Sequence, residues 1–294
     1  MSDAVFPVAI VGVGNMGSAM ALRLLSCGWP VHVFDLVERR SLALASAGAR
    51  VHATAAQAAS AARATIVCVV DAAQTRDVLF GTGAVAGAVP LAHTVFLCPT
   101  MEPAEVQDIA QALRPQGVFC IDAPMSGGPV RARDGSMSLM VACEAMVFER
   151  HRGLIETLSS RVFRISERPG DGARTKLVNN LAAGINLVGA AEVLALALRL
   201  GLDLERTLDV IEQSSGQSWI GSERMRRAIA GDLAPRAHMS LLAKDTRLAV
   251  QAALDAGFQG PLGSAARDVF AAACAGGLSG LDDAALLKWL TRDR

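Results

Sequence analysis

A lysine and an asparagine stand one helical turn apart near the start of a long apolar segment. The stretch GDGARTKLVNN spans residues 170–180 and places Lys176 four residues before Asn180, so both side chains fall on one face of a helix. An amine within an apolar helix is costly unless it has a partner or a task. Because burial lowers the pKa of a lysine, Lys176 could exchange protons near neutral pH. The alternative is a lysine that extends to the surface near the helix start.

A second polar motif is the glycine turn Ser126-Gly127-Gly128, within the sequence IDAPMSGGPVRARDG. It follows the apolar run Val118–Ile121, which we expect to form a buried strand. A hydroxyl beside several exposed backbone N–H groups suits the binding of a carboxylate. An ordinary glycine turn is the alternative for this motif taken by itself.

A third motif, GxGxxG, follows directly on the apolar run Val8–Val11. Gly12 permits a tight turn, Gly14 lets the backbone approach a pyrophosphate, and Gly17 lets the next helix pack on the strand. Asp35 ends the second apolar run, about 20 residues after the loop, where a ribose-binding carboxylate is expected. Strand, loop, helix and acidic residue together predict a dinucleotide site.

Asp35 also bears on which dinucleotide is bound. Its carboxylate can accept hydrogen bonds from a ribose 2′-hydroxyl, whereas it would repel a 2′-phosphate. Arg39 and Arg40 follow closely and could in principle reach a phosphate. Because Asp35 stands where that phosphate would lie, we expect NAD in preference to NADP.

The elements that must position these residues change in kind along the chain. Up to about residue 165, short apolar runs alternate with Ala-rich helical segments. This pattern is typical of a parallel sheet that is covered on both faces and binds its ligand at the carboxyl ends of its strands. We expect strands at Val8–Val11, Val31–Phe34, Thr65–Val70, Thr94–Leu97 and Val118–Ile121, and helices at Met16–Leu25, Leu42–Ala47, Ala73–Leu79 and Ala104–Leu113.

The second half carries helical patterns and no strand candidate. Residues 171–200 contain no proline and are apolar on nearly every face, so other helices or a second subunit must cover this helix. We expect an α/β Rossmann-type nucleotide domain over residues 1–165, then a long connecting helix and an all-helical domain over 166–294, assembled as a homodimer or homotetramer. Further helices are expected at Leu204–Gln213, Glu223–Ala230, Leu241–Ala256, Gly263–Ala275 and Asp282–Leu290.

Composition narrows the possible functions. The 28 basic residues balance 28 acidic ones without a basic stripe, which argues against nucleic acid or an anionic membrane as a partner. Apolar stretches are interrupted before the roughly 18 residues of a spanning helix, and the first residues do not form a signal peptide, so we expect a cytoplasmic protein. The absence of tyrosine excludes tyrosinate acid/base chemistry. Six scattered cysteines, without a CxxC pair, predict buried thiols in a reducing compartment and no metal site.

Four motifs, taken in order, resemble those of the β-hydroxyacid dehydrogenase family, which includes 3-hydroxyisobutyrate, tartronate semialdehyde and L-threonate dehydrogenases. They are the glycine loop GVGNMG, the substrate motif DAPMSGGP, the catalytic motif GDGARTKLVNN and the later LLAKD. The resemblance covers nearly the whole chain. It implies a Rossmann domain, a long connecting helix, a helical domain used in dimers or tetramers, and hydride transfer between NAD and a small 3-hydroxy acid.

The resemblance also implies roles for single residues. Lys176 would be the acid/base that exchanges a proton with the substrate hydroxyl, and Asn180 would hydrogen-bond the substrate beside it. Ser126, Gly127 and Gly128 would hold the substrate carboxylate. The implied cofactor contacts are Gly12, Val13, Gly14, Asn15, Met16, Gly17, Asp35, Thr100 and Lys244.

Two other functions and the choice of substrate stay open. An imine reductase shares the fold but generally lacks the catalytic lysine, and a non-catalytic dinucleotide-binding protein would be expected to lose Lys176 or the Ser-Gly-Gly turn. The stretch VVDAAQTRDVLFG resembles the threonate branch, whereas LGLD, SSGQSW and SLLAKD resemble the 3-hydroxyisobutyrate branch. Ser240 stands where threonate-type members carry an acidic residue, and the loop PTMEP around Thr100 departs from the usual Ser-Thr form.

Overall fold

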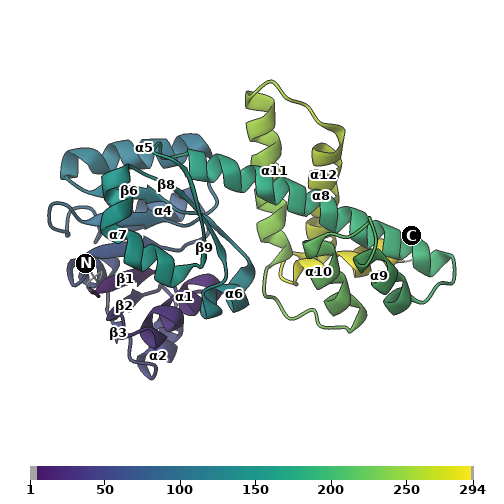
Figure 1. Ribbon diagram of the computed structural model, residues 1–294, viewed down its shortest axis with the longest axis horizontal. Helices are drawn as coiled ribbons and strands as arrows, with labels where there is room; N and C mark the ends of the chain where they lie inside the picture. Colours follow the sequence, from purple (N-terminus) through teal and green to yellow (C-terminus); the bar gives the residue numbers. More distant parts are fainter. Residues whose placement is uncertain (1–4, 293–294) are drawn as a thin grey trace. The chain divides into compact units, whose positions relative to one another are not determined.

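The computed structural model describes residues 5–292. The chain divides into two compact units on either side of the bond between Lys176 and Leu177, a point inside the long helix α8 (Asp171–Arg199). In the first unit a sheet lies between two layers of helices, and the second unit is helical (Figure 1). This architecture confirms the expected fold class.

The sheet of the first unit is built on five strands that the apolar runs predict. They run parallel, in the order β2, β1, β4, β5 and β6, so that Val8 pairs with Val31 on one side and Ala64 on the other. Every residue of the interior strand β1 is buried, as a strand covered on both faces requires. Their bounds are β1 Val8–Val11, β2 Val31–Phe34, β4 Ala64–Val67, β5 Thr94–Leu97 and β6 Phe119–Asp122.

Four further strands extend the sheet beyond this prediction. β3 (Arg50–Val51) lies on the outside of β2, while β8 (Ser138–Ala142) runs antiparallel to β6 and to β7 (Met125–Ser126). β9 (Arg161–Ser166) pairs parallel with β8. The sheet is therefore mixed at this edge. β3 and β7 contain only two residues each, so they have no periodicity to detect in the sequence, and tertiary pairing alone defines them.

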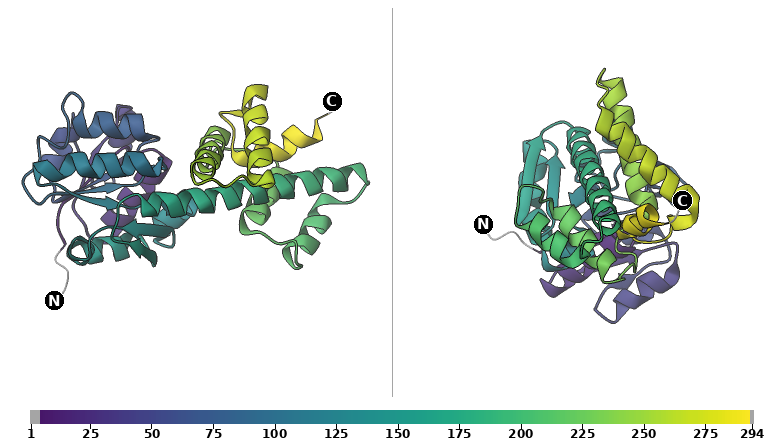
Figure 2. Two further views of the ribbon diagram at one scale, coloured as in Figure 1. Left: turned by 90° about the horizontal axis from the view of Figure 1, so that it is seen from above. Right: turned by 90° about the vertical axis from the view of Figure 1, so that its right-hand side faces the viewer.

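Helices cover the sheet with a separate apolar core on each face. Leu24 of α1 and Leu154 of α7 belong to one core, and Leu79 of α4 and Ile109 of α5 belong to the other. In the ribbon diagrams α5 and α7 lie on opposite faces of the sheet (Figures 1 and 2). The helices of this unit are α1 Asn15–Ser26, α2 Glu38–Ala45, α3 Ala55–Ser60, α4 Ala72–Phe80, α5 Pro103–Leu113, the 3₁₀ helix η1 Arg114–Gln116, α6 Gly128–Asp134 and α7 Ala145–Leu158.

The second unit has helices around one apolar core, which includes Leu187, Met225 and Phe270. Helices α11 and α12 lie side by side (Figure 1). Apart from one isolated bridge between His238 and Asp282, no strand pairing occurs in the described part of this unit. The later elements are α9 Leu204–Glu212, α10 Trp219–Ile229, α11 Met239–Asp255, α12 Pro261–Ala273, the π-helix η2 Cys274–Leu278, the 3₁₀ helix η3 Asp283–Ala285 and α13 Leu286–Thr291.

Helix α8 corrects the expectation about apolar length. By length and composition it could cross a membrane, because its few polar residues barely lower the mean hydropathy. A core helix of a soluble protein meets the same criteria, so one such helix is weak evidence for a membrane span. Val178, Val193 and Leu196 are 72%, 46% and 56% exposed, so this chain does not cover the helix on every face.

The expectation of buried cysteines holds fully for two of the six, while three are half-buried and one is exposed. All six are free thiols, and Cys98 and Cys143 are buried, but Cys27 is exposed because it follows the last turn of α1 at the surface. Among residues 5–292, no group of three or more His, Cys, Asp or Glu side chains is arranged to hold a metal ion.

Candidate active site

Two glycines of the loop are required by close contacts within the protein, whereas the third faces open space. At Gly12 φ is +89°, and a Cβ would lie 2.6 Å from the carbonyl oxygen of Cys68. A Cβ on Gly17 would clash with the carbonyl oxygen of Gly12. Gly14, by contrast, has nothing within 4 Å of its Cβ position and stands directly before α1. The open space at this helix N-terminus fits a pyrophosphate, which backbone N–H groups bind there.

Asp35 holds the glycine loop at the end of β2. Its Oδ2 accepts a hydrogen bond from the backbone N–H of Val13 at 2.8 Å, and its Oδ1 accepts one from Val37 at 2.8 Å. Arg40 Nη1 also lies 3.4 Å from Oδ1. A carboxylate has about four acceptor positions, so Asp35 keeps capacity for a ribose hydroxyl. Arg40, half exposed, is paired with this carboxylate rather than turned to an independent phosphate site.

The carboxyl ends of the parallel strands gather most of the predicted residues at one edge of the first unit. Gly12 follows β1, Asp35 follows β2, and Thr100 lies in the loop after β5. Asn15 is exposed and Met16 is half-buried in the first turn of α1. Because these strands are parallel, the loops that follow them share this edge.

The Ser-Gly-Gly motif forms the turn between β7 and α6. Gly127 has φ of +126° and Gly128 has φ of +75°, a region that side-chain-bearing residues rarely adopt. A Cβ on Gly127 would also lie 2.9 Å from Cδ of Arg131. The turn therefore needs both glycines for its own shape. Ser126 is half-buried beside it.

Asp122, which the sequence argument passed over, joins β6 to the start of α8. Its carboxylate is 1% exposed, and Oδ2 accepts hydrogen bonds from the backbone N–H groups of Gly170 at 2.8 Å and Ala173 at 3.1 Å. Burial raises the pKa of Asp122 to about 6, while the amides of Ala173, Gly170 and Gly172 act in the opposite direction. The sequence signal for Asp122 was an acidic residue at the end of an apolar strand, within the motif DAPMSGGP. From the sequence, only the serine and the glycines of that motif were assigned a role.

The start of helix α5, which follows the loop that carries Thr100, approaches the start of α8. A Cβ on Gly170 would lie 3.0 Å from the carbonyl oxygen of Pro103, the first residue of α5. Lys176 follows on the second turn of α8 and is 8% exposed. The alternative of a lysine that extends to the surface therefore does not describe it. Asp122 and Pro103 hold the helix start at the edge to which the glycine loop belongs.

In the second unit, Asp245 connects two of the predicted residues. The side-chain amide of Asn180 donates to Oδ2 of Asp245 at 2.6 Å. Lys244 Nζ lies 3.2 Å from Oδ1 of the same carboxylate; that contact is an ion pair and not an aligned hydrogen bond. Both Asn180 and Asp245 are buried. The sequence motif LLAKD indicated a role for its lysine, Lys244. The contacts of the adjacent Asp245 are seen only in the structure.

The predicted residues thus fall into two groups. The glycine loop, Asp35, Thr100, the Ser-Gly-Gly turn and Lys176 belong to the first unit, whereas Asn180 and Lys244 meet through Asp245 in the second. Lys176 and Asn180 are one turn apart on α8. This arrangement offers a helix N-terminus for phosphates, a carboxylate for a ribose, and a buried amine for proton transfer.

Two family models match the chain over nearly its whole length. Residues 7–166 match the NAD binding domain of 6-phosphogluconate dehydrogenase, and residues 170–290 match the NAD-binding domain of NADP-dependent 3-hydroxyisobutyrate dehydrogenase. An L-threonate dehydrogenase from Escherichia coli O6:H1 is 36% identical over 96% of this chain and 94% of that protein. A 3-hydroxyisobutyrate dehydrogenase from Pseudomonas aeruginosa is 32% identical over 90% of each. The crystal structure of a Salmonella typhimurium 3-hydroxyisobutyrate dehydrogenase is similar with a TM-score of 0.91 and 35% identity, covering 97% of this chain and 99% of that one.

Proposed function

Because this chain belongs to the β-hydroxyacid dehydrogenase family and is an NAD-dependent hydroxyacid dehydrogenase, we propose that Lys176 is its catalytic acid/base. The observation that carries the assignment is the burial of Lys176 on the second turn of α8, a helix whose first turn is held by Asp122 at the carboxyl end of β6. A buried amine is costly unless it has a partner or a task. Proton exchange with a substrate hydroxyl is such a task.

The reaction couples proton removal to hydride loss from the same carbon. The bound nicotinamide supplies the hydride acceptor. During oxidation the unprotonated amine of Lys176 takes the hydroxyl proton as the carbon–hydrogen bond breaks, and in reduction the protonated amine returns it. Ser126 and the backbone N–H groups of Gly127 and Gly128 hold the substrate carboxylate, which fixes the reacting hydroxyl toward Lys176.

Asn180 orients the substrate from the same helix face. One of its amide hydrogens is engaged by Asp245, and its Oδ1 accepts a hydrogen bond from Asn179 at 3.2 Å. The second amide hydrogen is then presented in a fixed direction to the substrate hydroxyl. Such preorganisation makes a polar group effective without reordering during the reaction.

We propose a small 3-hydroxy acid as the substrate, with L-threonate as the first candidate and 3-hydroxyisobutyrate as the second. The L-threonate dehydrogenase relative has the higher identity of the two compared here, 36% against 32%. Ser240, in the first turn of α11, favours the second candidate, because it replaces the acidic residue expected in the threonate branch.

Three finer properties complete the proposal. NAD is preferred to NADP, since Asp35 would repel a 2′-phosphate. The protein works in the cytoplasm. It assembles as a homodimer or homotetramer, in which a second copy covers the exposed apolar residues of α8, Val178, Val193 and Leu196. Exposed apolar side chains along one helix are typical of subunit contacts.

The experiment that tests this function follows the formation of NADH at 340 nm, the absorbance band of that cofactor, with a panel of hydroxy acids. The panel contains L-threonate, 3-hydroxyisobutyrate, glycerate and L-serine, each with NAD or NADP. We expect a kcat/KM in the range of ordinary enzymes, above roughly 10⁴ M⁻¹s⁻¹, for one small hydroxy acid with NAD. Turnover of cyclic imines with no turnover of any hydroxy acid would instead establish an imine reductase.

A further inference from the structure

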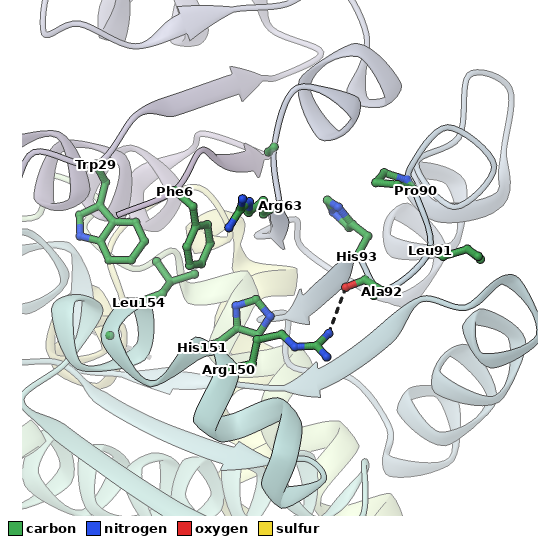
Figure 3. Close-up of a pocket in the computed structure, with 12 residues that line it drawn as sticks. Phe6, Trp29, Arg63, Pro90, Leu91, Ala92, His93, Arg150, His151 and Leu154 are labelled. Carbon is green, nitrogen blue, oxygen red and sulfur yellow. Dashed lines mark hydrogen bonds between the residues drawn. The ribbon is translucent and has the colours of Figure 1, made fainter. Parts of the chain in front are cut away.

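A cavity of about 410 Å³ opens at the edge of the sheet opposite to the glycine loop. Phe6, Trp29, Arg63 and His93 each lie just before a parallel strand, at its amino end, and Arg150 and His151 reach the cavity from α7 (Figure 3). Its volume falls within the range of sites for small organic molecules, roughly 300–1,000 Å³. The catalytic residues proposed above do not line it.

Among residues 5–292, the lining of the cavity is cationic and includes no carboxylate. Its lining contains Arg63 and Arg150 and no acidic residue. Neither arginine forms an ion pair with a carboxylate within residues 5–292. Arg150 instead donates to the carbonyl oxygen of Ala92 at 3.4 Å and lies over the ring of Phe119. Two guanidinium groups at one concave site favour an anionic ligand.

A buried histidine also lines the cavity. His151 is 3% exposed, and its Nε2 is 2.8 Å from the hydroxyl of Thr94. Its Nδ1 has no hydrogen-bond partner in the described residues. Because this nitrogen has almost no accessible surface, the ring forms part of the cavity wall and does not contact a ligand through Nδ1.

His93, which lies just before β5, has a similar arrangement. Its Nε2 is 2.9 Å from the hydroxyl of Thr65, and its Nδ1 likewise lacks a well-aligned hydrogen bond among residues 5–292. Burial lowers the pKa of both histidines to about 4, an effect that the Ala62 carbonyl partly offsets at His93. Both rings are therefore neutral at pH 7, and the arginines provide the positive charge.

The rim of the cavity is strained. Ala92 has φ of +66°, the one positive φ at a non-glycine residue in the described chain. This conformation directs a carbonyl to Arg150 and precedes His93. Strained backbone persists where the surrounding structure enforces it, frequently at ligand sites.

We propose that this cavity is a second small-molecule site, which binds an organic carboxylate with a flat apolar body. Arg63 and Arg150 hold the carboxylate, and the neutral rings of His93 and His151 line the cavity beside them. The apolar body lies against Phe6 and Leu154, where Phe6 also packs edge-to-face on Trp29 with 5.1 Å between ring centroids. The inference does not depend on the catalytic assignment of Lys176.

The test uses the five histidines of the chain as reporters. Protein labelled with ¹⁵N-histidine is titrated with sodium benzoate, and the imidazole resonances are followed by NMR. We expect saturable shifts of His93 and His151, with His32, His52 and His238 unchanged. Benzoate bound at the carboxyl-end edge would not produce this pattern. Benzyl alcohol, which has the ring without the charge, should bind at least about tenfold more weakly.

Matched variants separate a built site from a general charge effect. Arg63→Gln combined with Arg150→Gln should weaken benzoate binding by about tenfold or more. Arg161→Gln, which removes an exposed arginine of β9 outside the cavity, should leave it unchanged. All three positions are exposed, so folding should be preserved. The proposal is overturned if roughly 10 mM benzoate, enough to fill a site of millimolar affinity, leaves His93 and His151 unmoved. It also fails if the double variant binds as the wild type does.

Discussion

The side-chain amide of Asn180 donates a 2.6 Å hydrogen bond to the carboxylate of Asp245, and Lys244 lies 3.2 Å from the other oxygen of that carboxylate. One aspartate therefore contacts both Lys244 and Asn180, the amide that we propose orients the substrate. A buried hydrogen bond to a charged group contributes about 1.5–3 kcal/mol. The position of the Asn180 side chain should therefore depend on its hydrogen bond to Asp245.

Asp245→Ala should lower kcat/KM for the hydroxy acid by about 10- to 100-fold, the rate equivalent of that hydrogen bond. Asp245→Asn should retain part of the activity, because the side-chain oxygen can still accept from Asn180. Asp255→Ala, at the exposed end of the same helix, is the matched control. Steady-state kinetics on folded proteins provide the measurement, and an Asp245→Ala enzyme with wild-type kinetics would refute the positioning role.

Lys176→Ala should reduce kcat by ~10²–10⁴-fold, the usual contribution of positioned proton transfer. The dissociation constant for NAD should change little, since the glycine loop and Asp35 are expected to hold the cofactor. Lys176→Arg should not restore activity, because a guanidinium stays protonated and cannot accept the hydroxyl proton. Lys288→Ala is the control. A folded Lys176→Ala protein that binds NAD and keeps more than about a tenth of its kcat, against that expected loss, contradicts the mechanism.

Asp122 should make folding stability depend on pH in a defined direction. Its pKa is raised from 3.8 to about 6 in the folded protein, so the folded state holds its proton more tightly than the unfolded state does. The stability contribution of Asp122 is therefore full below pH 4 and declines as the pH rises to 6. The decline is of order 3 kcal/mol, at about 1.4 kcal/mol per pKa unit.

The measurement compares urea unfolding of the wild type and Asp122→Asn between pH 4 and pH 7. Because the amide does not titrate, the difference between the two free energies of unfolding should shift in favour of the variant as the pH rises. Asp122→Ala should be less stable than either, by about 1–3 kcal/mol for each N–H left without an acceptor. If the difference between the two free energies of unfolding stays constant across this pH range, Asp122 is not the source of the pH dependence.

Asp35→Ala should narrow the preference for NAD over NADP, because the carboxylate that repels a 2′-phosphate is gone. The substitution should also weaken the binding of NAD, since Asp35 holds the glycine loop by accepting hydrogen bonds from Val13 and Val37. The ratio of kcat/KM for the two cofactors measures the first effect, and Glu38→Ala on neighbouring α2 serves as control. Equal use of both cofactors by the wild type would show that Asp35 does not select NAD.

Val193→Lys combined with Leu196→Lys should weaken self-association, because both side chains are exposed on α8 and a charge in an apolar contact is costly. Light scattering at micromolar concentration should give a dimer or tetramer for the wild type and a smaller species for the variant. Thr157→Lys, on α7 of the first unit, is the control. A monomeric wild type would exclude the proposed assembly.

The sequence by itself determined the elements whose cause is local. The run Val8–Val11 is apolar at every position and became an interior strand, and Gly17 is required by its close approach to the carbonyl oxygen of Gly12 within the same strand–turn–helix unit. Asp35 ends a strand at the expected distance and meets the loop through Val13. The apolar helix from Asp171 was also readable, because its length, its apolar content and the absence of proline belong to one continuous segment.

Only the tertiary structure decided the partners of the polar groups. Asp122 meets the amide of Gly170, and Asn180 meets Asp245, across 48 and 65 residues of chain. No local pattern encodes such pairs, because a buried polar group takes whichever partner the packing of distant elements brings within hydrogen-bond reach. The two-residue strand Met125–Ser126 exists for the same reason: its pairing with β8 defines it. Local preference fixes which elements form, whereas burial and pairing between them select the residues that meet at the site.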